Sequence, residues 1–204
     1  MNTSANPPES TVCDTTALRY FAIVDQFDLL SRALGGKIST PRQVFDDEDD
    51  VDTPGALVSE LGASERYHRR RSVGGDEATD KWSRLRALRQ RNDIEILDLT
   101  DDEEAAYVDL KSTDLARAYG LASPLGSGEA AVIAIADHRR WRAAIDEHAG
   151  RSILNNRSPG HSIVTTRDLV RVAATEGFIS SPEAEIVYSD MLAEGYRGPQ
   201  TLWE

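Results

Sequence analysis

The alternation of short apolar segments with longer helical patterns constrains the fold of this chain more than any other feature. The short segments are rich in β-branched and small apolar residues, and the longer ones carry apolar residues at helical spacing. Strands separated by helices favour a parallel sheet that is covered by helices on both faces. The sequence therefore predicts an α/β protein with a three-layer α/β/α architecture and a mostly parallel central sheet. The predicted strands are residues 10–13, 37–40, 94–99, 142–145 and 162–165.

Helix-start and helix-stop signals divide the chain between these strands. A helix is predicted over residues 15–34, and the two glycines that follow it end it. Thr40 and Pro41 predict the start of the next helix, since they supply an N-cap and a proline at the first helical position. The sequence TDDE at 100–103 is a capping box, which opens a long helix that ends near Tyr119. Further helices are predicted at 78–91, 129–136, 147–154, 168–179 and 182–195.

Length and composition indicate one globular domain. The chain has 204 residues, of which 40% are hydrophobic and 28% are charged. Residues 1–9 are expected to be a disordered leader, and 10–204 a single domain with an irregular, arginine-rich insertion at about 50–95. The single cysteine, Cys13, excludes an intramolecular disulfide and a cysteine-rich zinc site. No apolar run approaches the roughly 20 residues of a membrane helix, and the polar N-terminus does not resemble a secretory signal, so a cytoplasmic protein without membrane contact is expected.

The distribution of charge is uneven. The net charge of −12 opposes general electrostatic binding to nucleic acid, because phosphate affinity comes from lysine and arginine. An acidic total with local basic patches is typical of a protein that holds metal with carboxylates and binds a phosphate chain elsewhere. Each patch by itself is equally consistent with a solvated helix face. One basic group lies within residues 66–91, and the second comprises His138, Arg139, Arg140 and Arg142.

Acidic residues follow several predicted strands or open the helices after them. Taken singly, an acid at a helix start most often caps the helix or interacts with its dipole. Taken together, acids that follow parallel strands lie at one edge of the sheet, where ligands bind in α/β proteins. Carboxylates gathered there repel one another unless a cation holds them, and Mg²⁺ or Mn²⁺ prefers such oxygen ligands. The acids at these positions are Asp14, Asp46, Asp47, Glu129, Asp146 and Glu147.

At these residues the sequence resembles the PIN domain family, and within it the compact VapC-like toxins of bacteria and archaea. The order and spacing of several short motifs carry the resemblance, which covers both ends of the chain but not residues 50–95. The matching segments are VCDTTALRYFAIVDQFDLL (12–30), STPRQVFDDE (39–48), GSGEAAVIAIA (126–136), AAIDEHAGRSIL (143–154) and SIVTTRDLVRVAATEGFI (162–179).

The resemblance implies a metal-dependent endoribonuclease, in which metal-activated water hydrolyses an RNA phosphodiester bond. Asp14 matches the family's first acid, Glu129 the acid of its GEA segment, and Asp47 a helix acid that is often glutamate. Asp146 and Glu147 match a pair of acids, and the sequence does not decide which of the two ligates the metal. All five are candidate ligands of Mg²⁺ or Mn²⁺, and all except Asp47 are candidate catalytic residues.

Further residues are candidates for contacting substrate or metal. Thr16 matches the small hydroxyl residue beside the first acid, and His148 lies close to the paired acids. Arg139 and Arg140 belong to the second basic group. Asp168 is a lower-ranked ligand candidate, because some PIN proteins read Thr-x-Asp at a strand end.

The resemblance also implies partners. The protein is expected to be the toxin of a toxin–antitoxin pair, with a small antitoxin chain lying over the acidic cleft, and to form a homodimer. The closing helices carry apolar residues that suit either a dimer interface or the core of the protein itself. These residues are Phe178, Ile186, Val187, Tyr188, Met191 and Leu192.

Particular residues of the sequence bear on other possible functions. The main alternative is a catalytically weak PIN-fold binding module that acts through a protein or RNA partner, because Glu147 and the 46–50 stretch depart from the family pattern. The sequence GGKIST at 35–40 lacks the earlier glycine of a phosphate-binding P-loop, and its lysine is followed by isoleucine. Phosphatases of the haloacid dehalogenase type need a second aspartate where this chain has Thr16. A flap-endonuclease-type DNA nuclease carries more acids and a helical arch that the sequence does not show.

Overall fold

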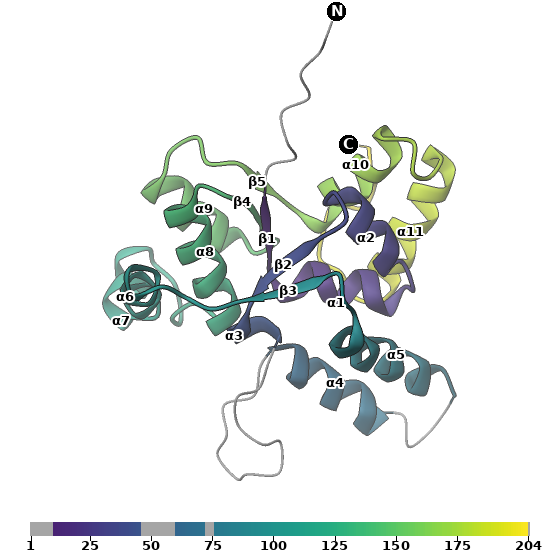
Figure 1. Cartoon of the computed structure of the whole chain (residues 1–204), viewed down its shortest axis with the longest axis horizontal. Coiled ribbons are helices and arrows are strands. Elements are labelled where there is room, and N and C mark those ends of the chain that lie inside the picture. The colour runs from purple at the N-terminus through teal and green to yellow at the C-terminus, as the bar shows by residue number, and fades with distance from the viewer. Residues whose placement is uncertain (1–9, 46–59, 72–75, 204) are drawn as a thin grey trace, which may run out of the picture.

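The fold is built on a sheet of five strands. The computed structural model describes residues 10–45, 60–71 and 76–203. The strands are β1 (Thr11–Cys13), β2 (Ile38–Pro41), β3 (Ile94–Leu97), β4 (Arg142–Ala144) and β5 (Ile163–Val164). They lie in the order β3-β2-β1-β4-β5, every pair between described residues is parallel, and helices cover both faces (Figure 1). The predicted three-layer α/β/α architecture is confirmed.

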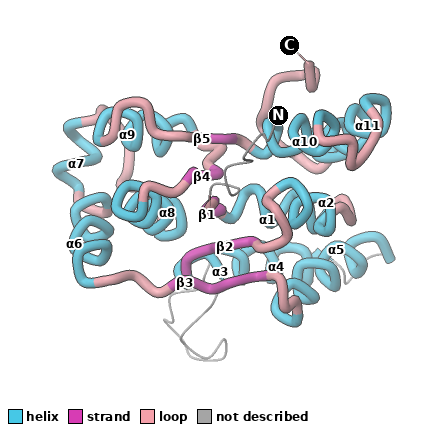
Figure 2. The backbone as a smooth tube through the Cα atoms, turned by 45° about the horizontal axis from the view of Figure 1, so that its top comes forward, coloured by secondary structure: helices cyan, strands magenta, loops and turns pink. Residues whose placement is uncertain are grey.

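Two groups of helices form the outer layers. The first group is α6 (Asp101–Leu110), α7 (Thr113–Ala118), α8 (Ser127–Arg139) and α9 (His148–Arg157). The second group is α1 (Thr15–Ile23), α2 (Phe27–Ala33), α10 (Thr166–Thr175) and α11 (Ser181–Ala193). In the first group α8 packs on the sheet and is itself covered by α6 and α9, while α1 in the second group packs with α2, α10 and α11. Figure 2 shows the two groups on opposite sides of the strands.

Local conformations break or shorten three of the predicted helices. The segment predicted over 15–34 forms α1 and α2, because Asp25 adopts a left-handed conformation (φ 60°) between them. The long helix predicted after the capping box forms α6 and α7, because the Ser112 hydroxyl accepts a hydrogen bond from a backbone amide of the second helix. Pro41 still belongs to β2, so the next helix, α3 (Arg42–Phe45), begins later than predicted.

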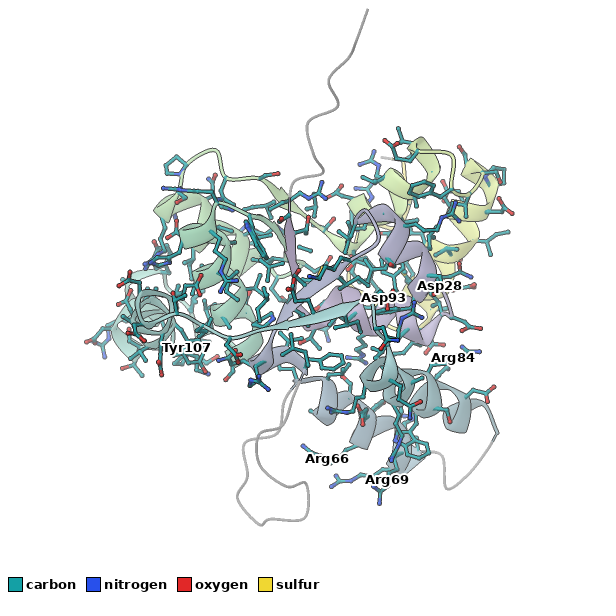
Figure 3. The ribbon with its side chains drawn as sticks, viewed as in Figure 1. Asp28, Arg66, Arg69, Arg84, Asp93 and Tyr107 are labelled. Carbon is teal, nitrogen blue, oxygen red and sulfur yellow. The ribbon has the colours of Figure 1, made fainter. Side chains whose placement is uncertain are left out.

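The arginine-rich segment predicted to be irregular contains two packed helices. They are α4 (Glu60–Arg71) and α5 (Asp76–Ala87), and α5 continues into the 3-10 turn η2 (Leu88–Gln90). Leu61 and Leu85 are fully buried, and the Arg84 guanidinium donates to the carbonyl of the last residue of α1 at 2.7 Å (Figure 3). The predicted helix at 78–91 is present, but α4 was not predicted. The predicted leader, residues 1–9, and residues 46–59 lie outside the described part of the chain.

Helix α8 forms the centre of the core. Every residue from Gly128 to Ala136 is buried, as expected for a helix that is apolar around its whole circumference. Its small side chains allow it to lie against β1, β2 and β4 at once. Burial on all sides fixes the direction of the helix, so the residues in its first turn are held rigidly.

The sheet changes its direction of growth between β1 and β4. The chain builds β1, β2 and β3 outward on one side and then returns to place β4 beside β1 on the other. Cys13 pairs with Ala144, and the amide of Asp14 donates to the Ala144 carbonyl at 3.1 Å. The residues that follow β1 and β4 therefore leave the sheet at the same carboxyl edge, which is where open α/β sheets bind ligands.

The closing helices belong mainly to the core of this chain. Val187, Tyr188 and Met191 are buried, and Ile186 is exposed. Their apolar residues therefore pack largely within the protein itself. Among the described residues, no helix combines the length and apolar character needed to cross a membrane.

Candidate metal centre

Asp14 lies at the point where β1 ends and α1 begins. It is the N-cap residue of α1, and its Oδ1 accepts a hydrogen bond from the Thr15 amide at 2.7 Å. The side chain is only 4% exposed. Burial raises the pKa of Asp14 well above its usual range, and the nearby carboxylates of Glu60, Glu129 and Asp146 raise it further. Capping explains one oxygen of this carboxylate, but it does not explain why so many acids surround it.

Glu129 enters the same region from the first turn of α8. Its Oε1 accepts a hydrogen bond from the Gly150 amide of α9 at 3.0 Å, and the residue is 9% exposed. Burial and the neighbouring Glu147 carboxylate raise the pKa of Glu129 to about 7. A glutamate with this pKa is poised to exchange its proton for a cation near neutral pH.

Glu60 is an acid of this site that the sequence did not reveal. Its carboxylate accepts hydrogen bonds from the Thr15 hydroxyl at 2.6 Å and from the Gly128 amide at 3.2 Å. It therefore joins the starts of α1, α4 and α8. Asp47, the helix acid predicted from the resemblance, lies outside the described residues. One local signal was available: Glu60 stands in the first turn of α4 and four basic residues stand in its last turn, as the helix dipole favours.

The structure separates the roles of the paired acids. Asp146 is enclosed: its carboxylate accepts hydrogen bonds from the amide and hydroxyl of Thr166, at 3.0 and 2.5 Å, and from the Tyr196 hydroxyl at 2.5 Å. Burial raises the pKa of Asp146, although these hydrogen bonds oppose the shift. Glu147 is exposed at the N-cap of α9 and makes no capping hydrogen bond. Glu147 is therefore the better placed of the two to ligate an ion, and Asp146 holds α9 and α10 together.

An open cleft of about 730 Å³ lies beside these helix starts. Its acidic lining consists of Glu60, Asp146, Glu147 and Glu194, and it includes neither Asp14 nor Glu129. Thr16 and His148, both predicted substrate contacts, also line it. The cationic lining comprises Arg19, Arg151 and Arg197. A cleft that presents acids beside arginines is suited to a phosphate group with an associated metal ion, since each charged component has a partner of opposite sign.

Three other predicted residues lie elsewhere. Arg139 and Arg140 are at the far end of α8 from Glu129, roughly 15 Å away along the helix axis at 1.5 Å per residue. Arg139 makes a bidentate ion pair with buried Glu103, in which guanidinium nitrogens donate to the two carboxylate oxygens at 2.6 and 2.8 Å. Asp168 accepts hydrogen bonds from the amide and hydroxyl of the α10 N-cap, in a capping box. None of the three lines the acidic cleft.

The chain was compared with protein-family models, with curated proteins and with solved structures. No match was found.

The donor set fits a hard divalent cation by its chemistry. Carboxylate oxygens are the preferred ligands of Mg²⁺ and Mn²⁺. Burial, and after it the neighbouring carboxylates, raise the pKa of Asp14 and of Glu129, and a bound cation would oppose both effects. Within the described residues, however, no three acidic, histidine or cysteine side chains already converge at ligand distance. The Gly150 amide donates to Oε1 of Glu129, and this hydrogen bond fixes the position of a carboxylate that would hold the ion.

Gly150→Ala should weaken Mn²⁺ binding by about tenfold or more, as for other changes beside a metal ligand. A methyl group at this position would lie 2.3 Å from Glu129 Oε1, so the carboxylate must move. Isothermal titration with Mn²⁺ measures the effect. Asn155→Ala, at an exposed position of the same helix, is the matched control and should leave binding unchanged. Equal affinity in Gly150→Ala and the parent protein would remove Glu129 from the ligand set.

Proposed function

We propose that this protein is a divalent-metal-dependent endoribonuclease of the PIN type. The observation that carries the proposal is that four helix starts, at the switch point of a parallel sheet, bring Asp14, Glu60, Glu129 and Glu147 into one neighbourhood. Glu60 accepts hydrogen bonds from Thr15 and Gly128, which are next to Asp14 and Glu129 in the chain. Four carboxylates in one place cost stability unless they serve a cation. The order of motifs that resembles the PIN family supports the same conclusion.

The residues have distinct roles in this proposal. Asp14, Glu129 and Glu147 would hold Mg²⁺ or Mn²⁺, with Glu60 as a further ligand. A bound ion of this kind polarises a phosphate oxygen and lowers the pKa of water. Asp146 is a positioning residue, because Thr166 and Tyr196 hold its carboxylate and fix the start of α9.

The arginines of the cleft would orient the scissile phosphate. Arg151 donates to the backbone carbonyl of Asp146, which places its guanidinium beside the acids. Arg19 Nε is buried and has no hydrogen-bond partner among the described residues, so it retains a donor for an anion. Neither histidine chemistry nor a nucleophilic side chain is needed for hydrolysis by an activated water.

The cellular role belongs to the same proposal. By resemblance, the protein acts in the cytoplasm as the toxin of a toxin–antitoxin pair, binds a small antitoxin chain over the cleft and forms a homodimer. An arginine from the antitoxin would find acidic partners in Glu60 and Glu147, which line the cleft.

A catalytically weak binding module of the same fold is the second candidate. It is favoured by one observation: no described set of three ligands is preformed, and hydrogen bonds occupy Asp146 and Glu60. In this alternative the cleft binds a partner and the ion contributes little. The two candidates differ in whether metal stabilises the protein and whether metal permits cleavage.

Cleavage of a single-stranded RNA oligonucleotide tests the proposal. The protein should cleave it with Mg²⁺ or Mn²⁺ and lose all activity in EDTA. Glu60→Gln should lower the rate by about 100-fold, as expected when a charged group that stabilises the transition state is removed. Glu104→Gln, an exposed glutamate of α6, is the control and should retain full activity. Cleavage that persists in EDTA, or equal rates for Glu60→Gln and the parent, would exclude the proposed centre.

A further inference from the structure

One face of α4 carries a basic, aromatic surface that runs away from the acidic cleft. We name it the α4 strip, and it consists of Ala63, Arg66, Tyr67, Arg70 and Arg71. These positions are three or four residues apart, so they lie on one side of the helix. They line a second hollow, of about 450 Å³.

The α4 strip and the acidic cleft are continuous. Ala63 lines both hollows, and Glu60, one turn before it on the same helix, lines the cleft. From Glu60 to Arg70 the helix rises roughly 15 Å at 1.5 Å per residue. At about 3.4 Å per nucleotide in a stacked strand, this distance covers about four nucleotides.

The cations of the α4 strip are available to an outside ligand. Within the described part of the chain, Arg66 and Arg70 take part in no ion pair. Figure 3 shows Arg66 extending from α4 away from the body of the protein. The acid nearest to them on the helix, Glu65, is paired with Arg89 at 3.0 Å, so it does not neutralise the strip.

Tyr67 adds an aromatic surface to these charges. Its side chain is 51% exposed, which is unusual for a large ring in this protein. Arg71 donates to the Tyr67 hydroxyl at 3.1 Å and lies over its ring at 5.5 Å, so the ring is held in place. A fixed, exposed ring between arginines is suited to stacking on a base, while guanidinium groups bind the flanking phosphates.

We propose that the α4 strip binds the segment of single-stranded RNA that flanks the scissile phosphate, and this rests on the proposed function of the cleft. A chain of net charge −12 repels a polyanion, so a local basic surface next to the acids favours the binding of an RNA strand there. The α4 strip provides that surface on the same helix that supplies Glu60. The exposed tyrosine favours a nucleic acid over an acidic protein surface as the ligand.

Binding is tested without cleavage, by fluorescence anisotropy of a labelled single-stranded RNA oligonucleotide in EDTA. The double variant Arg66→Gln/Arg70→Gln should bind about tenfold more weakly, and the slope of log K against log salt should fall by about 1.4, or 0.7 for each lost phosphate contact. Tyr67→Ala should weaken binding by about tenfold without changing that slope. Arg117→Gln, an exposed arginine of α7, is the matched control and should bind as the parent does.

Hydrolysis of two substrates separates the α4 strip from the proposed chemistry. In Mn²⁺, the double variant should cleave RNA with a higher KM, yet hydrolyse bis(4-nitrophenyl) phosphate, which has no flanking nucleotides, at the parental rate. Unchanged RNA binding by the double variant, or no RNA binding by the parent, overturns the inference. A third outcome is that polyglutamate binds as tightly as RNA, and that this binding depends on the arginines but not on Tyr67. That outcome overturns the inference in favour of an acidic protein partner. Arginine-dependent RNA binding without any hydrolysis supports the α4 strip and contradicts only the nuclease proposal.

Discussion

Replacing Asp14 with asparagine should reduce metal-dependent RNA cleavage by about 1,000-fold or more, because a ligand that supplies several kcal/mol of charge stabilisation is lost. The substitution keeps the shape of the side chain, and its oxygen can still accept the hydrogen bond from the Thr15 amide. The same change should make the metal-free protein more stable at pH 8. It removes a buried charge that Glu60, Glu129 and Asp146 repel.

The combination of lost activity and gained stability makes this result specific. A variant that merely unfolds loses both, whereas Asp14→Asn should show a higher melting temperature in EDTA than the parent. Cleavage rates and melting temperatures of the two proteins, each with and without Mn²⁺, test both parts of this prediction. Full activity in Asp14→Asn would end the nuclease proposal, and a lower melting temperature in EDTA would show that the carboxylate serves the fold.

The contribution of Glu129 to the free energy of unfolding of the metal-free protein should fall as the pH rises from about 4.5 to about 7. Burial raises the pKa of this carboxyl from 4.5 to about 7, with Glu147 as the second cause. The folded protein then holds the Glu129 proton more tightly than the unfolded chain does. The contribution of this proton to the free energy of unfolding is therefore complete below pH 4.5 and is lost as the pH rises to 7. At 1.36 kcal/mol per pKa unit, the loss is on the order of 3 kcal/mol.

The effect is measured as a difference between two proteins. Urea unfolding in EDTA at several pH values gives the free energy of unfolding of the parent and of Glu129→Gln, and the gap between them should change across this pH range. The difference removes the contribution of His68, whose pKa is lowered by burial and whose titration raises stability with pH in the same range. A constant gap from pH 4.5 to 7 would contradict a raised pKa at Glu129.

Metal should reverse the loss. Mn²⁺ replaces the proton on the carboxylates, so it should raise the melting temperature of the parent strongly at pH 8 and weakly at pH 5. Glu129→Gln should respond little at either pH. If the parent gains no stability from Mn²⁺ or Mg²⁺ at pH 8, the binding-module alternative describes the protein better than the nuclease does.

Several features of the fold were predictable because they depend on residues close together in the sequence. The capping box of Thr100 and Glu103 involves positions three apart, and both of its hydrogen bonds are present. The strand-and-helix alternation reflects local periodicity, and it was sufficient to predict the parallel three-layer architecture. The position of Asp14 at the carboxyl edge also follows from local order, since it stands between the end of β1 and the start of α1. Glu129 was predicted to open a helix, which it does, in the first turn of α8. The break at Asp25 was missed, because an aspartate in a left-handed conformation has no strong sequence signal.

The division of roles among the acids was decided by contacts between distant parts of the chain. Glu60 joins the site through Thr15, 45 positions away, so its place there depends on a contact between distant parts of the sequence. Asp146 and Glu147 are adjacent and chemically alike, yet Thr166 and Tyr196, 20 and 50 positions away, bind only Asp146. Likewise Arg139 forms an ion pair with Glu103, 36 positions before it, and does not line the cleft. The sequence by itself determined the sheet, its helices and the edge at which acids gather, because short-range hydrogen bonding and apolar periodicity are local. Only the tertiary structure decided which acids and arginines face the cleft, because a side chain's charge state and partners depend on what folding brings beside it.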